Sequence, residues 1–162
     1  MKSILFICIG NICRSPMAEG LLKHAQPDLA VLSAGINALV GEPADPLSIA
    51  LLRDHGIDIS EHRARSLASW MVNEADVILT MDAGQKRFIE NKYPESKSKV
   101  FRLCEDRQCD ISDPYRHGPD AFRVAFNLIS QGVDELMVRL AHIGEKKRYD
   151  LTAIREKQQA IF

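Results

Sequence analysis

The chain has 162 residues, of which 46% are hydrophobic and 27% are charged, and its formal net charge at pH 7 is −1. This size and composition are typical of one soluble domain with a substantial core. The balanced charge gives no general attraction to nucleic acid or to an anionic membrane surface, and we expect neither as a partner. The first apolar run ends at Gly10, too early for a signal peptide or a membrane span, and so we expect a cytoplasmic protein.

Short apolar runs alternate with amphipathic stretches along the chain, a pattern that favours parallel strands joined by helices. The predicted strands are Ser3–Ile7, Ala30–Ser33, Val77–Thr80 and Lys99–Arg102, and the predicted helices are Pro16–Ala25, Pro46–His55, Leu67–Asn73, Ala83–Tyr93 and Pro119–Ile143. Gly56 and Gly144 stand where the second and the last of these helices would end. The predicted fold is a single-domain α/β fold, an open sheet of four parallel strands with helices on both faces.

The composition changes only near the C-terminus. Glu145-Lys146-Lys147-Arg148 is a charged stretch directly after Gly144, and Leu151, Ile154 and Ile161 lie loosely on one helical face beyond it. We therefore expect a domain over residues 1–144 and a C-terminal extension over 145–162 that is helical in part. A frayed or partly docked terminal helix is the favoured interpretation of this extension, and a partner-binding or self-association segment is the alternative.

Residues 8–15, Cys8-Ile9-Gly10-Asn11-Ile12-Cys13-Arg14-Ser15, directly follow the first predicted strand and precede the first predicted helix. A strand, a tight loop and a helix start in this order can bind phosphate on backbone N–H groups. Arg14 can hold two phosphate oxygens at once with its planar guanidinium. Cys8 lies beneath these donors, and the helix terminus and the guanidinium are expected to lower its pKa, because both favour the thiolate. This arrangement predicts nucleophilic chemistry on phosphorus.

The last residue of this loop, Ser15, carries a hydroxyl group that could donate a hydrogen bond to the Cys8 thiolate. This hydrogen bond would ease the departure of the thiolate later in a reaction. The alternative interpretation of residues 8–15 is that Cys8 is a buried structural cysteine beside Arg14 as a surface arginine. The combined presence of Gly10, Asn11 and Ser15 between a strand and a helix favours the phosphate loop.

Such a reaction needs a proton donor for the leaving group. Asp113-Pro114-Tyr115 lies in a polar stretch between the last predicted strand and the long helix. Strand ends converge on the ligand site in open α/β sheets, so this stretch can reach the loop. Pro114 restricts the backbone of Asp113, and burial beside a bound dianion would raise the pKa of its carboxyl and keep it protonated. Asp-Pro is also a common turn opener, and three other carboxylates compete for the role, namely Asp106, Asp110 and Asp120.

The order of these motifs resembles the low-molecular-weight protein tyrosine phosphatases. The resemblance covers residues 3–142 and rests on Cys8 to Ser15 with Pro16, Ala18 and Glu19, on Ser33-Ala34-Gly35, on Met81-Asp82 and on Asp113-Pro114-Tyr115. It implies that Cys8 accepts the phosphoryl group as phosphocysteine, that Arg14 binds phosphate and stabilises the transition state, and that Asp113 is the acid and then the base. It places substrate contacts at Ile9, Gly10, Asn11, Ile12, Cys13, Ser15, Leu39 and Tyr115.

The resemblance also implies a supporting network around the loop. Asn11 would adopt a left-handed backbone conformation, which asparagine tolerates better than most residues, held by Ser15, Ser33 and His62. Without the resemblance, His62 could equally be a surface residue. Cys13 would be able to form a disulfide with Cys8 under oxidants and so protect it from over-oxidation. In the reduced state Cys13 would be a small apolar filler behind the loop.

The stretch Ser33–Gly41 and the segment Ala44-Asp45-Pro46 are similar to the bacterial branch encoded with exopolysaccharide export systems. That similarity implies a tyrosine-phosphorylated protein as substrate, and more narrowly a tyrosine autokinase, with the enzyme a monomer or weak dimer. The chain departs from many family members at Leu39, where a bulky aromatic residue is usual, and it keeps Tyr115 as the second pocket wall. This departure predicts a more open pocket, unless Leu39 is ordinary loop packing.

The four cysteines are Cys8, Cys13, Cys104 and Cys109, and in a reducing cytoplasm they are expected to be free thiols. Their spacing does not match structural zinc sites, so we predict no metal site, and we expect no cofactor. The main rival to a phosphatase is an arsenate reductase of the same architecture, in which Cys104 and Cys109 would relay a disulfide. A non-catalytic phosphotyrosine-binding module is a second rival, but it would need neither Cys8 nor Asp113.

Overall fold

The computed structural model of the chain describes residues 3–159. Its centre is a sheet of four parallel strands in the order β2-β1-β3-β4. The strands are β1 (Ser3–Cys8), β2 (Ala30–Gly35), β3 (Val77–Thr80) and β4 (Val100–Arg102). The predicted four-stranded parallel sheet is therefore confirmed, with strand ends within two residues of those expected.

The two central strands are apolar except for Ser3 at the start of β1 and Thr80 at the end of β3, because helices cover both of their faces. In β1 the run from Ile4 to Ile7 is at most 1% exposed, and all four residues of β3 are buried. Side chains alternate between the two faces, so Phe6 packs into one core and Leu5 with Ile7 into the other. The sequence of β1 thus suits only a central position in the sheet.

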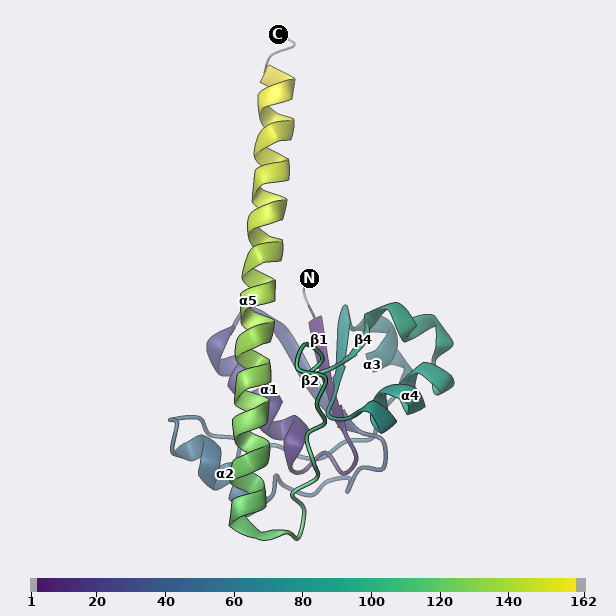
Figure 1. The fold of residues 1–162 in the computed structure, drawn as a ribbon, viewed down its shortest axis with the longest axis vertical. Coiled ribbons are helices and arrows are strands. Elements are labelled where there is room, and N and C mark those ends of the chain that lie inside the picture. The colour runs from purple at the N-terminus through teal and green to yellow at the C-terminus, as the bar shows by residue number, and fades with distance from the viewer. Residues whose placement is uncertain (1–2, 160–162) are drawn as a thin grey trace.

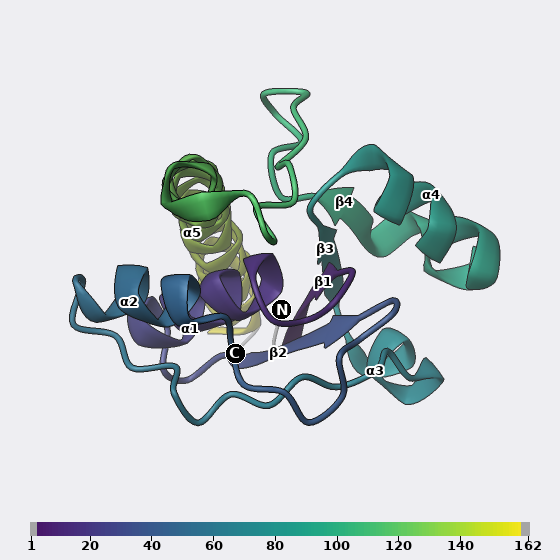
Figure 2. The ribbon, with the colours of Figure 1, turned by 90° about the horizontal axis from the view of Figure 1, so that it is seen from below.

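Helices lie on both faces of the sheet, as expected (Figure 2). Helices α1 (Arg14–Ala25), α2 (Pro46–Arg53) and α5 (Gly118–Gln159) pack together on one side. Helices α3 (Ser69–Glu74) and α4 (Ala83–Lys92) lie on the other side. A short 3₁₀ helix over Pro94–Lys99 leads into β4, in a stretch for which the sequence predicted no helix.

The ends of two helices follow from local chemistry. The Asp45 carboxylate accepts a hydrogen bond from the Leu47 N–H at the start of α2, and Asp82 caps α4 in the same way through the Gln85 N–H. Gly56 follows α2 with φ +74°, a left-handed conformation that ends helices, and this confirms its predicted place. Helix α1 begins at Arg14, two residues earlier than the expected start at Pro16.

The expected end of the last helix at Ile143 is wrong, because α5 continues through Gly144 to Gln159. Glycine costs a helix only about 1 kcal/mol, and glutamate, lysine and arginine are good helix formers, so the charged stretch 145–148 does not interrupt it. The side chains of α5 that join the core extend to Leu140. Beyond the body of the domain the helix projects alone (Figure 1).

The topology brings four strand ends to one edge of the sheet. The chain passes from β1 to β2 on one side and then crosses to β3 on the other, so β1 lies at the point where the strand order reverses. Ligands of open α/β sheets bind outside the carboxyl ends of strands at this point. The loop after Cys8 occupies that position. Within the part of the chain that the structure describes, no helix has the length and apolar character needed to cross a membrane.

Candidate active site

The loop between β1 and α1 turns its carbonyl groups outward. Six successive carbonyl oxygens, those of residues 8–13, each accept a hydrogen bond. The donors are, in order, the N–H groups of Ile36, Asn37 and Leu39, the ring Nε2 of His62, the N–H of Asp45, and for the last the N–H of Met17 with the hydroxyl of Ser48. In a trans peptide the carbonyl and the following N–H point in opposite directions, so the N–H groups of residues 9–14 face inward.

A cavity of about 170 Å³ lies inside this ring of N–H groups. The residues that line it come from the loop, from the turn after β2 and from the segment before α5, namely Cys8, Ile9, Gly10, Ile12, Cys13, Arg14, Asn37, Leu39, Asp113 and Tyr115. Inward N–H groups at a helix N-terminus attract anions. The predicted phosphate loop therefore has the geometry of an anion site.

Asn11 fixes the shape of the loop. Its φ is 57°, the left-handed conformation that the resemblance implied, and the residue is fully buried. Its amide nitrogen donates to the hydroxyls of Ser15 and Ser33, both at 2.9 Å, and its side-chain oxygen accepts from the Arg65 N–H at 2.9 Å. The structure thus brings together Asn11, Ser15 and Ser33, three residues that the resemblance places in the network supporting the loop.

His62 completes the network from the loop after α2. Its Nε2 lies 2.7 Å from the Asn11 carbonyl oxygen, which can only accept, so Nε2 carries the proton. Burial lowers the pKa of His62 below its ordinary value of 6.5, although the hydrogen bond to Asn11 opposes this. His62 is therefore neutral near pH 7 and is not a surface residue.

A buried carboxylate lies behind the network. Glu19, on α1, is 6% exposed, accepts a short hydrogen bond from the Ser33 hydroxyl, and pairs with Lys23 at 2.5 Å. A buried carboxylate is stable only when it is paired and hydrogen-bonded, and here both partners are present. Glu19 thereby holds Ser33 in the orientation that accepts from Asn11.

Cys8 forms the floor of the cavity at the end of β1. Cys8 is 3% exposed, and its sulfur lies 2.9 Å from the Ser15 hydroxyl oxygen. The Ser15 hydroxyl also accepts from Asn11, so its own hydrogen is free to point at the sulfur. The predicted serine donor is thus in place.

Arg14 is 2% exposed and lies in the wall of the cavity. One terminal nitrogen donates to the Ile111 carbonyl at 2.7 Å and lies 3.5 Å from Asp82, and the other lies 3.4 Å from Asp113. Its Nε is buried and has no hydrogen-bond partner within the described residues. A buried donor without a partner is costly, so this group is suited to an anion in the cavity.

Asp113 is the carboxylate of its segment that reaches Arg14. Its side chain is 48% exposed, and its Oδ1 accepts from the Tyr115 N–H at 3.2 Å, which orients the carboxyl. The three competing carboxylates bind elsewhere: Asp106 pairs with Arg139, Asp110 with Arg102, and Asp120 with Arg123. Among these four carboxylates, the geometry favours Asp113 as the proton donor for the leaving group.

The mouth of the cavity is partly apolar. Leu39 is 42% exposed and Ile9 39% exposed, and both line the cavity. Tyr115 forms the facing wall, with the Arg116 guanidinium 5.0 Å from its ring centre. Leu39 therefore belongs to the pocket wall and is not merely loop packing.

The other cysteines differ from Cys8 in their surroundings. Cys13 is 4% exposed against Phe122 and Ala64, and burial raises its pKa, so it does not ionise readily. Burial and a hydrogen bond to Cys109 raise the pKa of Cys104 to about 12. The Cys109 N–H donates to the Cys104 carbonyl oxygen at 3.4 Å, so these two cysteines are neighbours, as a relay pair would be, and all four cysteines are free thiols.

Sequence reasoning missed several contacts of the site. Asp82 was named only as part of the resemblance and was given no role, but it lies two residues after β3 and 3.5 Å from a terminal nitrogen of Arg14. An acidic residue close behind a buried strand could have indicated this contact. The Ile111 carbonyl and the Arg65 N–H could not have been found, because every residue carries such groups and only the fold brings these two to the site. Glu19 was noted only as part of the resemblance. Among the described residues, no group of three potential metal ligands comes together.

Comparison with known proteins agrees with this geometry. The model of the family described as low molecular weight phosphotyrosine protein phosphatase matches residues 3–149. A curated relative from Ralstonia nicotianae, the probable low molecular weight protein-tyrosine-phosphatase EpsP, is 50% identical over 144 residues, which are 89% of this chain and 99% of the relative.

Two solved structures are similar in fold. Vibrio vulnificus Wzb in complex with benzylphosphonate has a TM-score of 0.81 and 34% identity, covering 85% of this chain and 98% of its own. The YwlE arginine phosphatase from Geobacillus stearothermophilus has a TM-score of 0.85 and 33% identity, covering 90% and 97%. On the match of the family model and the identity to the Ralstonia relative, this chain belongs to the low molecular weight phosphotyrosine protein phosphatase family.

Proposed function

We propose that this phosphatase hydrolyses protein phosphotyrosine in two steps through a phosphocysteine on Cys8. In the first step the Cys8 thiolate attacks phosphorus, the bond to the phenolic oxygen breaks, and the Asp113 carboxyl donates its proton to that oxygen. In the second step the Asp113 carboxylate takes a proton from water as the water attacks phosphorus, and the P–S bond breaks to release phosphate. The Ser15 hydroxyl stabilises the departing thiolate through the 2.9 Å contact.

The observation that carries this proposal is that the inward N–H groups, the Cys8 thiol and Arg14, whose Nε has no hydrogen-bond partner among the described residues, line one cavity. A phosphoryl group between them would meet donors on every side except the one facing the leaving group. Because Asp113 lies at that open side and contacts Arg14 at 3.4 Å, it is the group in position to protonate the phenolate. Charge that develops on the phosphoryl oxygens is stabilised by donors that need not reorganise.

Rapid mixing with p-nitrophenyl phosphate tests the two-step route. We expect a burst of nitrophenolate equal to the enzyme concentration, followed by slower steady turnover. Cys8→Ser should abolish both phases, and Arg14→Ala should abolish turnover and phosphate binding. Cys109→Ser is a matched control, because Cys109 is a half-buried thiol outside the cavity, and it should keep the burst. A normal burst in Cys8→Ser would overturn the assignment of the nucleophile.

The hydrogen bond from the Cys109 N–H to the Cys104 carbonyl oxygen makes these two cysteines neighbours, which keeps an arsenate reductase as the second candidate. The double variant Cys104→Ser/Cys109→Ser distinguishes the two, with its urea midpoint as the check on folding. Unchanged hydrolysis of aryl phosphate by the double variant supports the phosphatase. Arsenate-dependent oxidation of thioredoxin that the same change abolishes would support the reductase.

We further propose that the substrate is a bacterial tyrosine autokinase of an exopolysaccharide system, met in the cytoplasm by a monomer or weak dimer. The support is the similarity of residues 33–41 to that bacterial branch, together with the relatives EpsP and Wzb. Purified autophosphorylated kinase should lose phosphate to this enzyme faster than an unrelated phosphotyrosine protein. A peptide carrying phosphoarginine belongs in the same assay, since one structural relative is an arginine phosphatase, and preference for it would refute the tyrosine assignment.

We also propose that Cys13 protects Cys8 by forming a disulfide with it under peroxide. Peroxide would convert the Cys8 thiol to sulfenic acid with loss of water, and the Cys13 thiol would then displace a second water to close the S–S bond. Both sulfurs line one cavity, which supports the pairing. Cys13→Ser should lose the ability to regain activity with dithiothreitol after peroxide treatment.

A further inference from the structure

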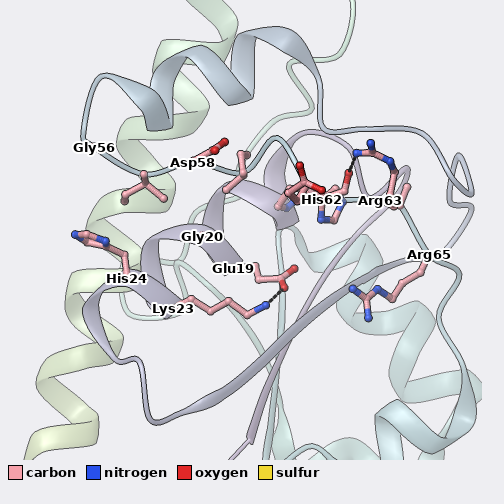
Figure 3. Close-up of a pocket in the computed structure, with 14 residues that line it drawn as sticks. Glu19, Gly20, Lys23, His24, Gly56, Asp58, His62, Arg63 and Arg65 are labelled. Carbon is pink, nitrogen blue, oxygen red and sulfur yellow. Dashed lines mark hydrogen bonds and ion pairs between the residues drawn. The ribbon is translucent and has the colours of Figure 1, made fainter.

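A second and larger cavity, of about 770 Å³, lies between α1 and the loop that follows α2 (Figure 3). We call it the α1 pocket; its walls are residues 16–24 of α1 and residues 56–65 of the loop. None of its lining residues lines the phosphate cavity. Its size falls within the range of small-molecule sites in proteins, about 300–1,000 Å³.

The floor of the α1 pocket is apolar. Gly20 packs so closely that a side chain there would lie 2.7 Å from Ile59, and Ile57 and the buried Ala64 continue this surface. Because Gly20 has no side chain, Ile59 can approach α1 this closely and form part of the floor. An apolar body can therefore rest on it.

Most of the charged groups around the pocket already have partners. Glu19 is held by Ser33 and Lys23, and Asp58 accepts the Ser60 N–H at 2.8 Å, a hydrogen bond that lowers the pKa of its carboxyl. Arg63 donates to the carbonyl groups of Ser60 and His62.

Two charged side chains of the pocket remain. The Arg65 guanidinium and the Glu61 carboxylate line the pocket, and neither has a side-chain hydrogen bond or ion pair within the part of the chain that the structure describes. Figure 3 shows Arg65 on the same side of the pocket as Lys23 and Glu19. Because Lys23 already offsets Glu19, the positive charge of Arg65 is uncompensated on that side.

We propose that the α1 pocket binds a small organic anion, with its acidic group on Arg65 and its apolar body over Ile57 and Ile59. A guanidinium fork matches the oxygens of a carboxylate, sulfonate or phosphate group. Lys23 adds a second cation on the same side. Glu61 carries the opposite charge and disfavours such a ligand, so the two unpaired side chains make opposite contributions to its affinity.

Occupancy of this pocket alters turnover, a part of the proposal that rests on the proposed function. Three of its residues hold Asn11: His62 through the Asn11 carbonyl, Arg65 through its N–H, and Glu19 through Ser33. An anion that draws Lys23 from Glu19 leaves that buried carboxylate with one partner fewer. The phosphate loop then loses support, and kcat falls.

The dye 8-anilinonaphthalene-1-sulfonate is a suitable probe, because it joins a sulfonate to an apolar body and brightens when bound. The titration uses the full chain with vanadate in the active site. We expect Arg65→Gln to weaken binding about tenfold, the worth of a charge-assisted hydrogen bond, and Glu61→Gln to tighten it about threefold. Lys97→Gln removes an exposed cation outside the pocket and should change nothing. Amide shifts of Gly20 and Gly56 locate the dye, and urea midpoints verify the folding of each variant.

Binding of the dye to the α1 pocket and the effect of that binding on kcat are tested by different outcomes. Equal affinity of the dye for Arg65→Gln and Glu61→Gln overturns the site. At saturating dye and without vanadate, we expect kcat for aryl phosphate to fall about fivefold, the lower end of typical coupling between sites. An unchanged kcat overturns the coupling. Dye binding itself requires no turnover, so a failure of the proposed phosphatase mechanism would leave the binding result intact and be recognised separately.

Discussion

At the scale of single residues, Asn11 joins the shape of the phosphate loop to the rest of the domain. Its left-handed backbone turns one peptide, and its side chain and carbonyl bind four other residues, Ser15, Ser33, His62 and Arg65. Few residue types tolerate this conformation, and fewer offer both a donor and an acceptor.

We expect Asn11→Ala to lower the free energy of unfolding by about 3 kcal/mol, from the strained backbone and the lost hydrogen bonds. Asn11→Gly is the matched control, since glycine accepts the positive φ and loses only the hydrogen bonds. It should be about 1 kcal/mol more stable than the alanine variant in urea titrations. Equal stability of the two variants would show that backbone strain contributes nothing here.

His62 should make stability depend on pH. Its pKa in the folded protein is lowered by burial, so as pH falls below 6.5 the unfolded chain binds a proton before the folded one does. The stability that His62 gives the folded protein is therefore fully present above pH 6.5. Below pH 6.5 this stability declines by at most about 1.4 kcal/mol per pH unit. Urea titrations at pH 7.5 and 5.5 should show a smaller difference between wild type and His62→Gln at the lower pH. A constant difference would contradict a neutral, half-buried imidazole.

Asp113→Asn should lower kcat by about 10²–10⁴, the usual effect of removing a positioned acid. The loss should be larger for phenyl phosphate than for p-nitrophenyl phosphate, because nitrophenolate leaves more easily without a proton. Asp106→Asn is the control, since Asp106 pairs with Arg139 and does not line the cavity. If Asp113→Asn turned over both substrates as fast as wild type, another group would be the acid.

Much of the site could be predicted because its chemistry belongs to particular side chains. Cys8, Arg14 and Asp113 have the thiol, guanidinium and carboxyl groups that such a reaction needs, and the fold brings the three together. Main-chain partners such as the Ile111 carbonyl could not be predicted, because they depend on where the chain passes.

At the scale of elements, strands were easier to predict than helix ends. A strand buried on both faces, such as β3, is apolar over nearly its whole length, here from Val77 to Leu79, so its position is visible in the sequence. The end of α5 was not visible, since Gly144 and a charged stretch favour a helix end locally but do not require one. The short 3₁₀ helix over Pro94–Lys99 has no periodic pattern to reveal it.

Two glycines of α5 should respond oppositely to alanine. A side chain at Gly132 would lie 2.6 Å from Leu103 Cγ and 3.1 Å from the Leu103 carbonyl, whereas nothing lies within 4 Å at Gly144. We expect Gly132→Ala to lower the free energy of unfolding by about 1–3 kcal/mol through overpacking. Gly144→Ala should raise helicity in circular dichroism, because alanine favours helix by about 1 kcal/mol. A Gly132→Ala variant as stable as wild type would mean that α5 is not packed against Leu103.

At the scale of the whole molecule, the parallel sheet with helices on both faces could be predicted from the alternation of strands and helices. The strand order could not, because the pattern of one strand does not reveal its neighbours. We infer that residues 1–144 form the catalytic domain and that 145–162 are an extension, since Leu140 is the last core side chain of α5 among those that the structure describes, which end at Gly144.

A chain that ends after Gly144 should therefore keep its kcat for aryl phosphate and a single urea transition. The control is a chain that ends after Gly132, which lacks the buried Val133 and the packed Leu136, Met137 and Leu140 and should unfold at lower urea. Loss of kcat in the chain that ends after Gly144 would show that residues 145–162 support the active site.

The projecting part of α5 has a practical consequence for attaching the enzyme to a surface. A helix of 42 residues is roughly 63 Å long, and its first turn follows the Asp113 segment while its far end stands clear of the domain (Figure 1). A bead, a resin or a sensor chip linked at the carboxyl end would leave the catalytic mouth facing bulk solution. Immobilised enzyme should thus accept even large phosphoproteins.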